Sequence, residues 1–232
     1  MTTPTVLITG ANRGIGLELT RQFLQQGWAV LACCRNPSAA PQLTALTQES
    51  NQIEIFQMDV TDYQQVTDLS AQLKDRPIDL LLSNAGIYGP KSITFGEVDA
   101  IVWREVLEVN TIAPLMLVQA FAGQVAASHK KLIAIVSSKV GSIADNGSGG
   151  SYMYRSSKTA VNQVMKSLSI DLSARGVSVF SLHPGWVATD MGGPNAEISV
   201  EQSVAGLMTI LQSAGPDQNG QFLEYNGATI PW

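Results

Sequence analysis

Cysteine and histidine are scarce in this chain, with two of each among 232 residues. Cys33 and Cys34 are adjacent in a strand-like segment, where neighbouring side chains point to opposite faces and cannot readily form a disulfide. We therefore expect both to be reduced, buried packing residues. Only His129 accompanies His183, which precedes Pro184 at a strand end, so we predict no metal site and a packing role for His183.

Charged residues are also few, at 14% of the chain, and the net charge is -5. No stretch gathers lysine and arginine, so the sequence predicts no nucleic-acid partner and no attraction to an anionic membrane. The longest apolar run, residues 112 to 127, is too short to span lipid and contains Gln119. The first four residues lack the basic region of an export signal, so we predict a cytoplasmic protein.

What the chain does contain is an alternation of short β-rich runs with helical patterns. Several runs consist of Val, Ile and Leu without polar alternation, which is typical of parallel strands covered on both faces. Because 45% of the residues are hydrophobic, one large core is expected. We predict a single α/β domain over residues 1–232, with a doubly wound, seven-stranded parallel sheet in three α/β/α layers. The predicted strands are Thr5–Ile8, Trp28–Cys33, Ile53–Met58, Leu80–Leu82, Lys131–Ser137, Val177–Leu182 and Phe222–Tyr225.

Local signals mark helix ends and one unusual loop. Ser199 followed by Gln202 predicts a capping box at a helix start, and Gly176 predicts the end of the helix that carries Lys158. Residues 142–150 are rich in glycine and serine and lie just before Tyr154. We predict that this stretch is a mobile loop beside the functional site.

Three glycines, Gly10, Gly14 and Gly16, lie between the first predicted strand and the first helix. Without side chains, such a loop lets backbone amides approach a pyrophosphate at the positive end of the helix. The spacing differs from G-x-G-x-x-G and lacks the Gly-Lys-Ser/Thr ending of a phosphate-hydrolysing loop, which makes nucleotide hydrolysis a poor alternative.

Tyr154 and Lys158 are four residues apart on a predicted helix, so both side chains point off the same face. A positive charge beside a phenol lowers the phenol pKa. A phenol pKa near 10 must fall by about three pKa units to reach neutral pH, which corresponds to about 4 kcal/mol. One unit charge at roughly 4 Å supplies about that energy at an effective dielectric near 20. We expect Lys158 alone to be nearly sufficient to lower the phenol pKa to neutral pH. Hydrogen bonds and the charge of a bound dinucleotide would offset the opposing effect of desolvation.

The glycine loop, Asn84-Ala85-Gly86, Ser138, Tyr154-x-x-x-Lys158 and Pro184-Gly185 occur in this order at predicted strand ends. The set resembles the short-chain dehydrogenase/reductase family over nearly the whole chain. The segment 183–193 and the ending Tyr225-Asn226-Gly227 are similar to the branch that contains the C-factor signalling protein and sniffer-type carbonyl reductases. The resemblance implies a Rossmann-type sheet and a nicotinamide-dependent oxidoreductase.

The resemblance also implies four catalytic residues. Tyr154 would be the general acid in carbonyl reduction, Lys158 its cationic neighbour, and Ser138 rather than Ser137 the donor to the substrate oxygen. Asn110, on a long predicted helix, would hold through its main-chain carbonyl a water that contacts the lysine. The loop 142–150 places Ser138 further before the tyrosine than is common in the family, which affects the expected shape of the pocket.

The second strand ends without the acidic residue that would bind the adenosine ribose of NAD. Arg35 follows that strand and Arg13 lies in the glycine loop, so we predict that both contact the 2′-phosphate of NADP(H). By resemblance, Asp59 and Val60 border the adenine, and Pro184, Gly185, Val187 and Thr189 flank the nicotinamide. The full predicted cofactor set is Gly10, Asn12, Arg13, Gly14, Ile15, Gly16, Arg35, Asp59, Val60, Asn84, Ala85, Gly86, Tyr154, Lys158, Pro184, Gly185, Val187 and Thr189.

The predicted substrate pocket is apolar and partly aromatic, because Tyr88, Val140, Tyr152, Trp186 and Met191 fall on loops at the carboxyl edge of the sheet. No charged residue there is committed to a substrate, so we predict a small, neutral aldehyde, ketone or quinone as the partner.

We therefore expect an NADPH-dependent carbonyl reductase. The alternative is a dinucleotide-binding signalling or redox-sensing protein of C-factor type with little turnover. A nucleotide-sugar epimerase or dehydratase would need a longer substrate-binding extension than this chain has. By resemblance, the protein forms a homodimer or homotetramer through helices around residues 104–127 and 153–174.

Overall fold

The computed structural model describes residues 3–232 and contains one seven-stranded sheet, in the order β3-β2-β1-β4-β5-β6-β7. Every neighbouring pair of strands is parallel. This confirms the predicted Rossmann-type, doubly wound sheet. The strands are β1 Thr5–Thr9, β2 Ala29–Cys34, β3 Ile53–Gln57, β4 Leu80–Ser83, β5 Leu132–Val136, β6 Ser178–His183 and β7 Phe222–Glu224.

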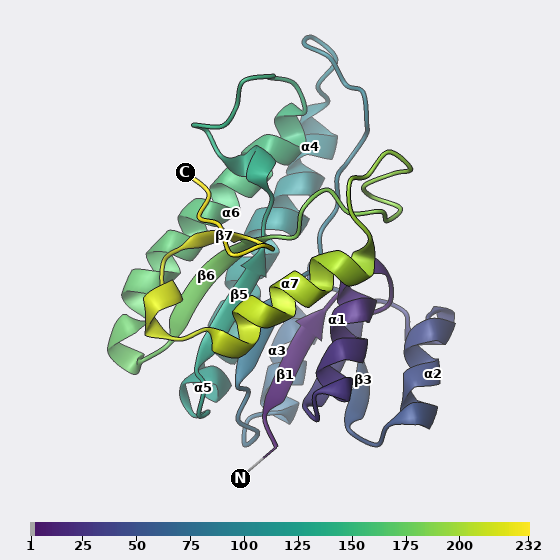
Figure 1. Ribbon diagram of the computed structural model, residues 1–232, viewed down its shortest axis with the longest axis vertical. Coiled ribbons are helices and arrows are strands. Elements are labelled where there is room, and N and C mark those ends of the chain that lie inside the picture. Colours follow the sequence, from purple (N-terminus) through teal and green to yellow (C-terminus); the bar gives the residue numbers. More distant parts are fainter. Residues whose placement is uncertain (1–2) are drawn as a thin grey trace.

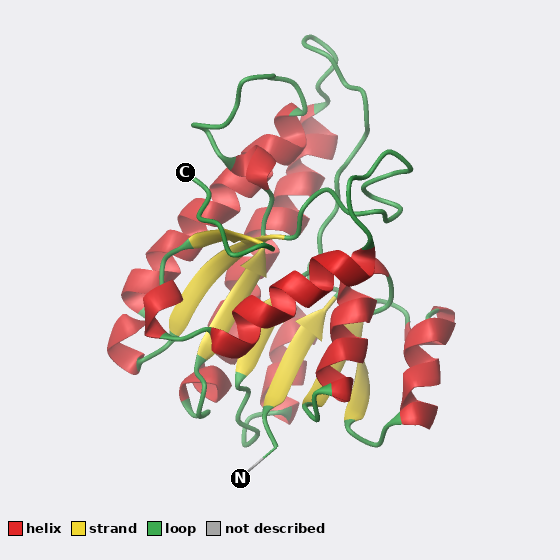
Figure 2. Ribbon diagram, in the orientation of Figure 1, coloured by secondary structure: helices red, strands yellow, loops and turns green. Residues whose placement is uncertain are grey.

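Helices cover both faces of the sheet (Figures 1 and 2). One face packs against α1 Gly14–Gln25, α2 Pro41–Glu49 and α7 Val200–Ser213, and the other against α3 Tyr63–Gln72, α5 Ala113–Ala126 and α6 Tyr152–Asp171. The helix α4 Ala100–Leu107 runs into α5 through a π-turn, η2 Glu108–Ile112. Short 3-10 turns are η1 Pro37–Ala39, η3 Lys139–Gly141, η4 Ser173–Arg175 and η5 Pro216–Gln218.

The core consists of two layers because successive strand side chains alternate between the faces. Val6 and Ile8 of β1 face α1 and α7, whereas Leu7 between them faces α3 and α5. Cys33 and Cys34 behave in the same way: they are free, buried and in opposite layers, as predicted. Burial raises the pKa of the Cys33 thiol far above its ordinary value, which makes it an inert packing group.

Element boundaries differ from the predictions by one residue at several strand ends, and two helix signals were wrong in part. The Ser199 side chain accepts a hydrogen bond from the Gln202 backbone at 3.1 Å, but no return bond from the Gln202 side chain completes the capping box. Gly176, with φ of 72°, ends the turn η4 and not α6 itself. Residues 142–150 form a loop without helix or strand, as predicted, and its mobility stays a prediction.

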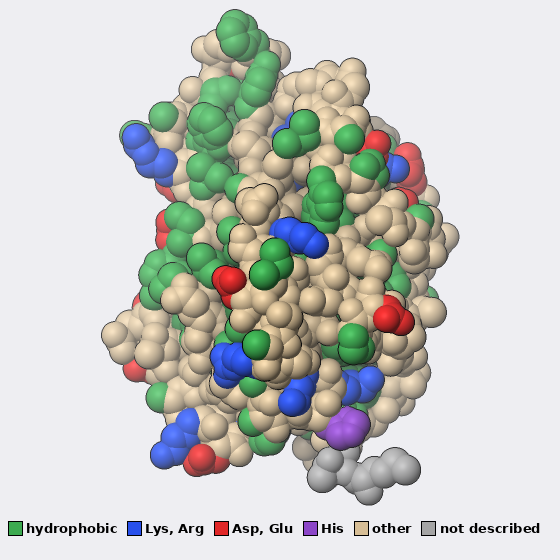
Figure 3. All heavy atoms as spheres, turned by 90° about the vertical axis from the view of Figure 1, so that its left-hand side faces the viewer, with side chains coloured by type: hydrophobic (Ala, Val, Ile, Leu, Met, Phe, Trp, Pro, Cys, Tyr) green, Lys and Arg blue, Asp and Glu red, His purple; other side chains and the backbone are tan. Residues whose placement is uncertain are grey.

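Residues 100–126 form one helix that is long and apolar enough to cross a membrane, a length that the apolar run in the sequence did not reveal. Leu117, Phe121 and Val125 of this helix are buried in the core layer between the sheet and α3, α5 and α6. This side of the helix is therefore packed as in a core helix. On the face shown in Figure 3, acidic and basic side chains are interspersed and the upper part is rich in hydrophobic side chains.

Candidate active site

Several predicted site residues lie at the carboxyl ends of strands. The glycine loop follows β1, Asn84 follows β4, Ser138 follows β5 and Pro184 follows β6. The chain order reverses between β1 and β4, which are adjacent in the sheet, and ligands of open α/β sheets bind in the crevice at that point.

The glycine loop fits tightly against the segment after β4. A side chain on Gly16 would place its Cβ at 2.2 Å from the Gly10 carbonyl oxygen, and one on Gly10 would lie 3.1 Å from the Ala85 Cα. The Asn84 side chain donates to the Thr9 carbonyl at 2.9 Å, while the Thr9 hydroxyl accepts from the backbone amides of Asn84 and Ala85. The loop is thus a rigid cradle at the start of α1, as a bound pyrophosphate requires.

A second contact joins the glycine loop to the segment after β6. The Thr189 methyl group lies 3.3 Å from the position of a Cβ on Gly14, whose φ is +52°. The Arg13 guanidinium pairs with Asp190 at 2.9 Å, and both side chains are largely exposed. The structure therefore brings Gly14, Arg13 and Thr189 together as the cofactor prediction requires, although Asp190 already holds Arg13.

Tyr154 and Lys158 lie on one face of α6, as predicted, but their charges do not interact as expected. The Lys158 ammonium is buried, donates to the Val136 carbonyl at 2.9 Å and lies 5.7 Å from the centre of the Tyr154 ring. Burial raises the pKa of Tyr154 to about 12, and a hydrogen bond with Ser138 opposes this only in part. The expectation that Lys158 alone nearly suffices to lower that pKa was wrong, because desolvation is the larger effect.

Burial also lowers the pKa of Lys158, to about 8. The buried lysine is therefore poised to lose or keep its proton near neutral pH, depending on what else enters the crevice. A group that accepts hydrogen bonds from the ammonium would favour its charged form, and the charged form in turn favours ionisation of Tyr154.

Ser138 is the serine that faces Tyr154. It is buried at the end of β5 and hydrogen-bonds the phenol, whereas the Ser137 hydroxyl donates to the Lys158 backbone carbonyl at 3.4 Å. The choice of Ser138 over Ser137 therefore agrees with the geometry. Next to it, Gly141 in η3 packs so closely on α6 that a Cβ would lie 2.8 Å from the Lys158 backbone.

Asn110 lies in the π-turn, a feature of helices that is frequent at functional sites. Its side chain accepts from the Ile87 amide at 2.9 Å, and donates to the Ile87 carbonyl at 2.8 Å and to the Ser157 hydroxyl at 3.0 Å. The side chain thus fastens the segment after β4 to α6 beside Lys158. This side-chain role was missed at the sequence level, where only the main-chain carbonyl was considered.

We expect Asn110→Ala to destabilise the protein by about 2 kcal/mol, because the partly buried amide and carbonyl of Ile87 lose their partners. Urea unfolding at neutral pH measures this change. Gln119→Ala, at an exposed position further along the same helix, is the control and should stay within about 0.5 kcal/mol of the parent. An equally small effect for Asn110→Ala would contradict the fastening role.

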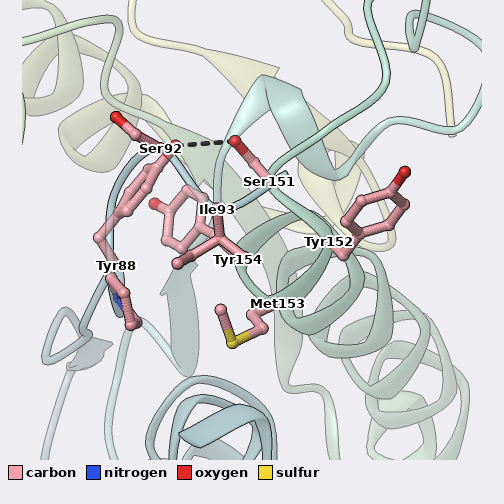
Figure 4. Close-up of a pocket in the computed structure, with 8 residues that line it drawn as sticks. Tyr88, Ser92, Ile93, Ser151, Tyr152, Met153 and Tyr154 are labelled. Atoms are coloured by element: carbon pink, nitrogen blue, oxygen red, sulfur yellow. Dashed lines mark hydrogen bonds between the residues drawn. The ribbon is translucent and has the colours of Figure 1, made fainter. Parts of the chain in front are cut away.

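A small cavity of about 50 Å³ opens beside Tyr154 (Figure 4). Of the five residues predicted for the substrate pocket, Tyr88 and Tyr152 line it, but Val140, Trp186 and Met191 do not. The indole of Trp186 instead donates to the Gly192 carbonyl at 2.8 Å in an exposed loop. The complete lining is Tyr88, Pro90, Ser92, Ile93, Ser151, Tyr152, Met153 and Tyr154.

The missed lining residues come from two segments, 90–93 and 151–153, that carry no catalytic motif. Residues 151–153 could have been found from their position next to Tyr154 in the sequence. Pro90, Ser92 and Ile93 had no local signal, because only the tertiary fold brings the loop after β4 to the start of α6.

Other predicted cofactor residues also follow strands of the sheet. Arg35 is exposed directly after β2, and Asp59 after β3 accepts bonds from the Thr61 amide and hydroxyl. The Pro184 carbonyl accepts from Ser203 at 2.5 Å, and buried Val187 pairs with Ile198. His183, just before Pro184, has its pKa lowered to about 4 by burial, so it is neutral at physiological pH.

Residues 4–198 match the family model for short chain dehydrogenases. The chain belongs to this family. It is 37% identical to the C-signal of Myxococcus xanthus over 156 residues, which are 67% of this chain and 93% of that protein. Over the full length of both chains it is similar in structure to the carbonyl reductase Sniffer of D. melanogaster, with a TM-score of 0.94 and 35% identity.

An NADPH-bound carbonyl reductase from chicken fatty liver is similar over the full length of both chains, with a TM-score of 0.93 and 33% identity. The family, the parallel sheet and the order of its motifs make this short-chain dehydrogenase an oxidoreductase of Rossmann type.

Proposed function

We propose that this short-chain dehydrogenase reduces an uncharged aldehyde, ketone or quinone with NADPH. The observation that carries the proposal is the convergence of Ser138, Tyr154 and Lys158 beside an uncharged cavity at the carboxyl edge of the sheet. The similarity to carbonyl reductases, one of them NADPH-bound, supports the same reaction and cofactor.

The cofactor supplies the hydride, and the chain supplies the proton and the positioning. Ser138 donates a hydrogen bond to the substrate oxygen, on which negative charge develops. Tyr154, already bonded to Ser138, delivers its phenolic proton to that oxygen. Lys158 stabilises the phenolate that remains. This matters because a buried phenolate without a cation nearby is energetically unfavourable.

The residues that would hold NADPH are those of the predicted cofactor set. The cradle of Gly10, Gly14 and Gly16 suits the pyrophosphate, since side chains would fill it. Asn84 and Ala85 form its wall, and Pro184, Gly185 and Thr189 border it from the segment after β6. Arg13 and Arg35 supply the positive charge that a 2′-phosphate requires.

Arg35→Ala and Arg13→Ala should each lower kcat/KM with NADPH about tenfold and leave kcat/KM with NADH nearly unchanged, since only NADPH carries the 2′-phosphate. Steady-state kinetics with NADPH and with NADH give the ratio of the two kcat/KM values for the parent and each variant. Arg76→Ala is a matched control, because Arg76 is paired with Glu54 and is not part of the proposed phosphate site. A parallel loss with both cofactors, or a parent enzyme that prefers NADH, would refute the assignment.

A signalling protein that binds dinucleotide with little turnover is the second candidate, because the C-signal of Myxococcus xanthus is a relative. That similarity covers 67% of this chain, whereas the carbonyl reductases match all of it. A sensor also has no need for Ser138, Tyr154 and Lys158 together. The enzyme is therefore the better account.

A spectrophotometric screen of NADPH oxidation over neutral aldehydes, ketones and quinones tests the proposal. Turnover of at least one such class is expected; turnover only of a strongly charged compound would overturn it. The homodimeric or homotetrameric state and the cytoplasmic location stay predictions, which light scattering and cell fractionation would address.

A further inference from the structure

The ring of Tyr88 covers one face of Tyr154. Tyr88 lies in the loop after β4, and the two rings are stacked with centroids 4.5 Å apart and planes inclined by 27°. The Tyr88 hydroxyl is hydrogen-bonded to the Ser151 hydroxyl at 3.0 Å (Figure 4). We call this hydrogen bond the latch, because it joins the loop after β4 to the start of α6 across the cavity.

The cavity beside this stack is too small for a ring-bearing substrate. Its volume of about 50 Å³ accommodates only a few waters, at about 10–15 Å³ for each. Its walls combine polar groups, including serine and tyrosine hydroxyls, with the apolar side chains of Pro90, Ile93 and Met153, and none of the lining side chains is charged. A ring that is to reach the phenol of Tyr154 needs more room than this, and Tyr88, which covers one face of Tyr154, is the side chain in its way.

The backbone on both sides of the latch contains residues in the left-handed region. Gly89, directly after Tyr88, has φ of +79°. On the other side Ser151 has φ of 45° and follows Gly149 and Gly150, both at φ of 64°. A serine in the left-handed region is disfavoured, and the latch is the contact that fixes its side chain.

We propose that Tyr88 determines substrate choice by admitting flat, uncharged carbonyl compounds to Tyr154 in preference to bulky non-planar ones. The latch holds the Tyr88 ring over Tyr154 until a substrate enters. A flat ring then packs between the freed face of Tyr88 and the wall formed by Ile93 and Met153. This proposal rests on the proposed function, since it concerns the same site.

Flat rings are favoured because the side chains that would contact them are a flat aromatic ring, Tyr88, and a flexible thioether, Met153. Aromatic rings stack with a gain beyond that of buried area alone, and the Met153 thioether contacts ring edges favourably. A saturated ring of the same size is thicker and forfeits the stack. The preference therefore depends on the aromatic ring at position 88 and not on its hydroxyl.

Acetophenone and cyclohexyl methyl ketone have rings of the same size, but only the first is flat. The carbonyl of acetophenone is also conjugated with its ring; this difference in intrinsic reactivity is the same for every variant, so the comparison between variants isolates the effect of the ring at position 88. We expect the parent enzyme to favour acetophenone about tenfold in kcat/KM, and Tyr88→Leu to abolish that preference. Tyr88→Phe keeps the ring and should keep the preference. An unchanged preference in Tyr88→Leu, or a lost one in Tyr88→Phe, would overturn the proposal.

The latch is tested by removing either of its hydroxyls. Tyr88→Phe and Ser151→Ala should each lower KM for both ketones about fivefold with little change in kcat, and the double variant should gain nothing more. Ser167→Ala removes an exposed hydroxyl of the same helix and is the matched control. Additive effects in the double variant, or KM values unchanged in both single variants, would contradict a latch.

Equilibrium binding separates this proposal from the proposed function. Calorimetric titration of the NADP⁺-loaded protein with each ketone gives the same preference without turnover, and circular dichroism confirms that Tyr88→Leu is folded. If no ketone is reduced but acetophenone binding still depends on the ring at position 88, the reductase assignment fails and the role of Tyr88 stands. If ketones are reduced but binding ignores that ring, the role of Tyr88 fails alone.

Discussion

Tyr154→Phe should lower kcat by about 10³-fold or more while the dissociation constant for NADPH changes by less than about twofold. The loss follows because phenylalanine keeps the ring stacked on Tyr88 but has no proton to give to a substrate oxygen. General acids contribute about 10² to 10⁴-fold, and here the removed hydroxyl is also the partner of Ser138. Steady-state NADPH oxidation gives kcat, and quenching of protein fluorescence gives the affinity.

Tyr63→Phe is the matched control for this variant. The Tyr63 phenol is also hydrogen-bonded, to Glu108, and its pKa is likewise raised by burial, yet it lies on α3, outside the candidate site. Its removal should leave kcat within about twofold of the parent. Residual turnover above about a tenth of the parent rate in Tyr154→Phe would remove Tyr154 as the proton donor.

Lys158→Met should yield an inactive but more stable protein. Burial lowers the pKa of Lys158 from 10.5 to about 8, and at about 1.4 kcal/mol per unit the charged lysine costs the free protein about 3 kcal/mol at pH 7. Methionine removes this cost but leaves the Val136 carbonyl without its donor, and the lost hydrogen bond reduces the gain in stability by about 1 kcal/mol. We expect a net gain of about 2 kcal/mol in the free energy of unfolding.

The pH dependence of that gain identifies its cause. Between pH 8 and 10.5 the unfolded chain keeps the lysine proton that the folded chain has lost, so the parent gains stability as pH rises through this window. The advantage of Lys158→Met should therefore be full below pH 8 and absent above pH 10.5. Tyr154 titrates higher, and it is present in both proteins, so its contribution cancels in the comparison.

Urea unfolding at pH 7 and pH 11 measures the two limits, with Lys166→Met as control because Lys166 is exposed on the same helix. The control should change stability by less than about 0.5 kcal/mol at either pH. A destabilised Lys158→Met at pH 7, or a gain that persists at high pH, would show that the buried ammonium is not under strain.

The sheet, and the placement of the candidate catalytic pair on one helix face, were predictable because they depend on local patterns. Runs such as Leu80–Ser83 are apolar throughout and therefore indicate buried parallel strands, and Tyr154 and Lys158 are joined by helix periodicity alone. Their mutual electrostatics were not predictable, since the direction of the Lys158 side chain toward Val136 depends on packing between α6 and β5. Burial, which sequence shows poorly at single polar residues, decided the pKa of both groups.

The pocket was predicted less well than the catalytic residues for a related reason. Trp186 and Met191 were placed there because they follow β6, but the loop folds back on itself through the bond from Trp186 to Gly192. Ile93 and Pro90 entered the pocket through a long connection after β4, whose path no residue pattern specifies. Which loop closes a site is thus a tertiary property, even where the strand ends are known.

The π-turn at Glu108–Ile112 makes the chain sensitive to its length at this point. The five-residue turn holds one residue more than a regular α-helix would place there, so removing one residue would restore a regular helix while α4 and α5 keep their phase. The bulge that presents Asn110 to Ile87 would be lost, and with it the fastening of the loop after β4. Side chains along this helix can be exchanged in evolution. A single-codon deletion in the turn, in contrast, would disrupt the site, because the loop after β4 would no longer be held by Asn110.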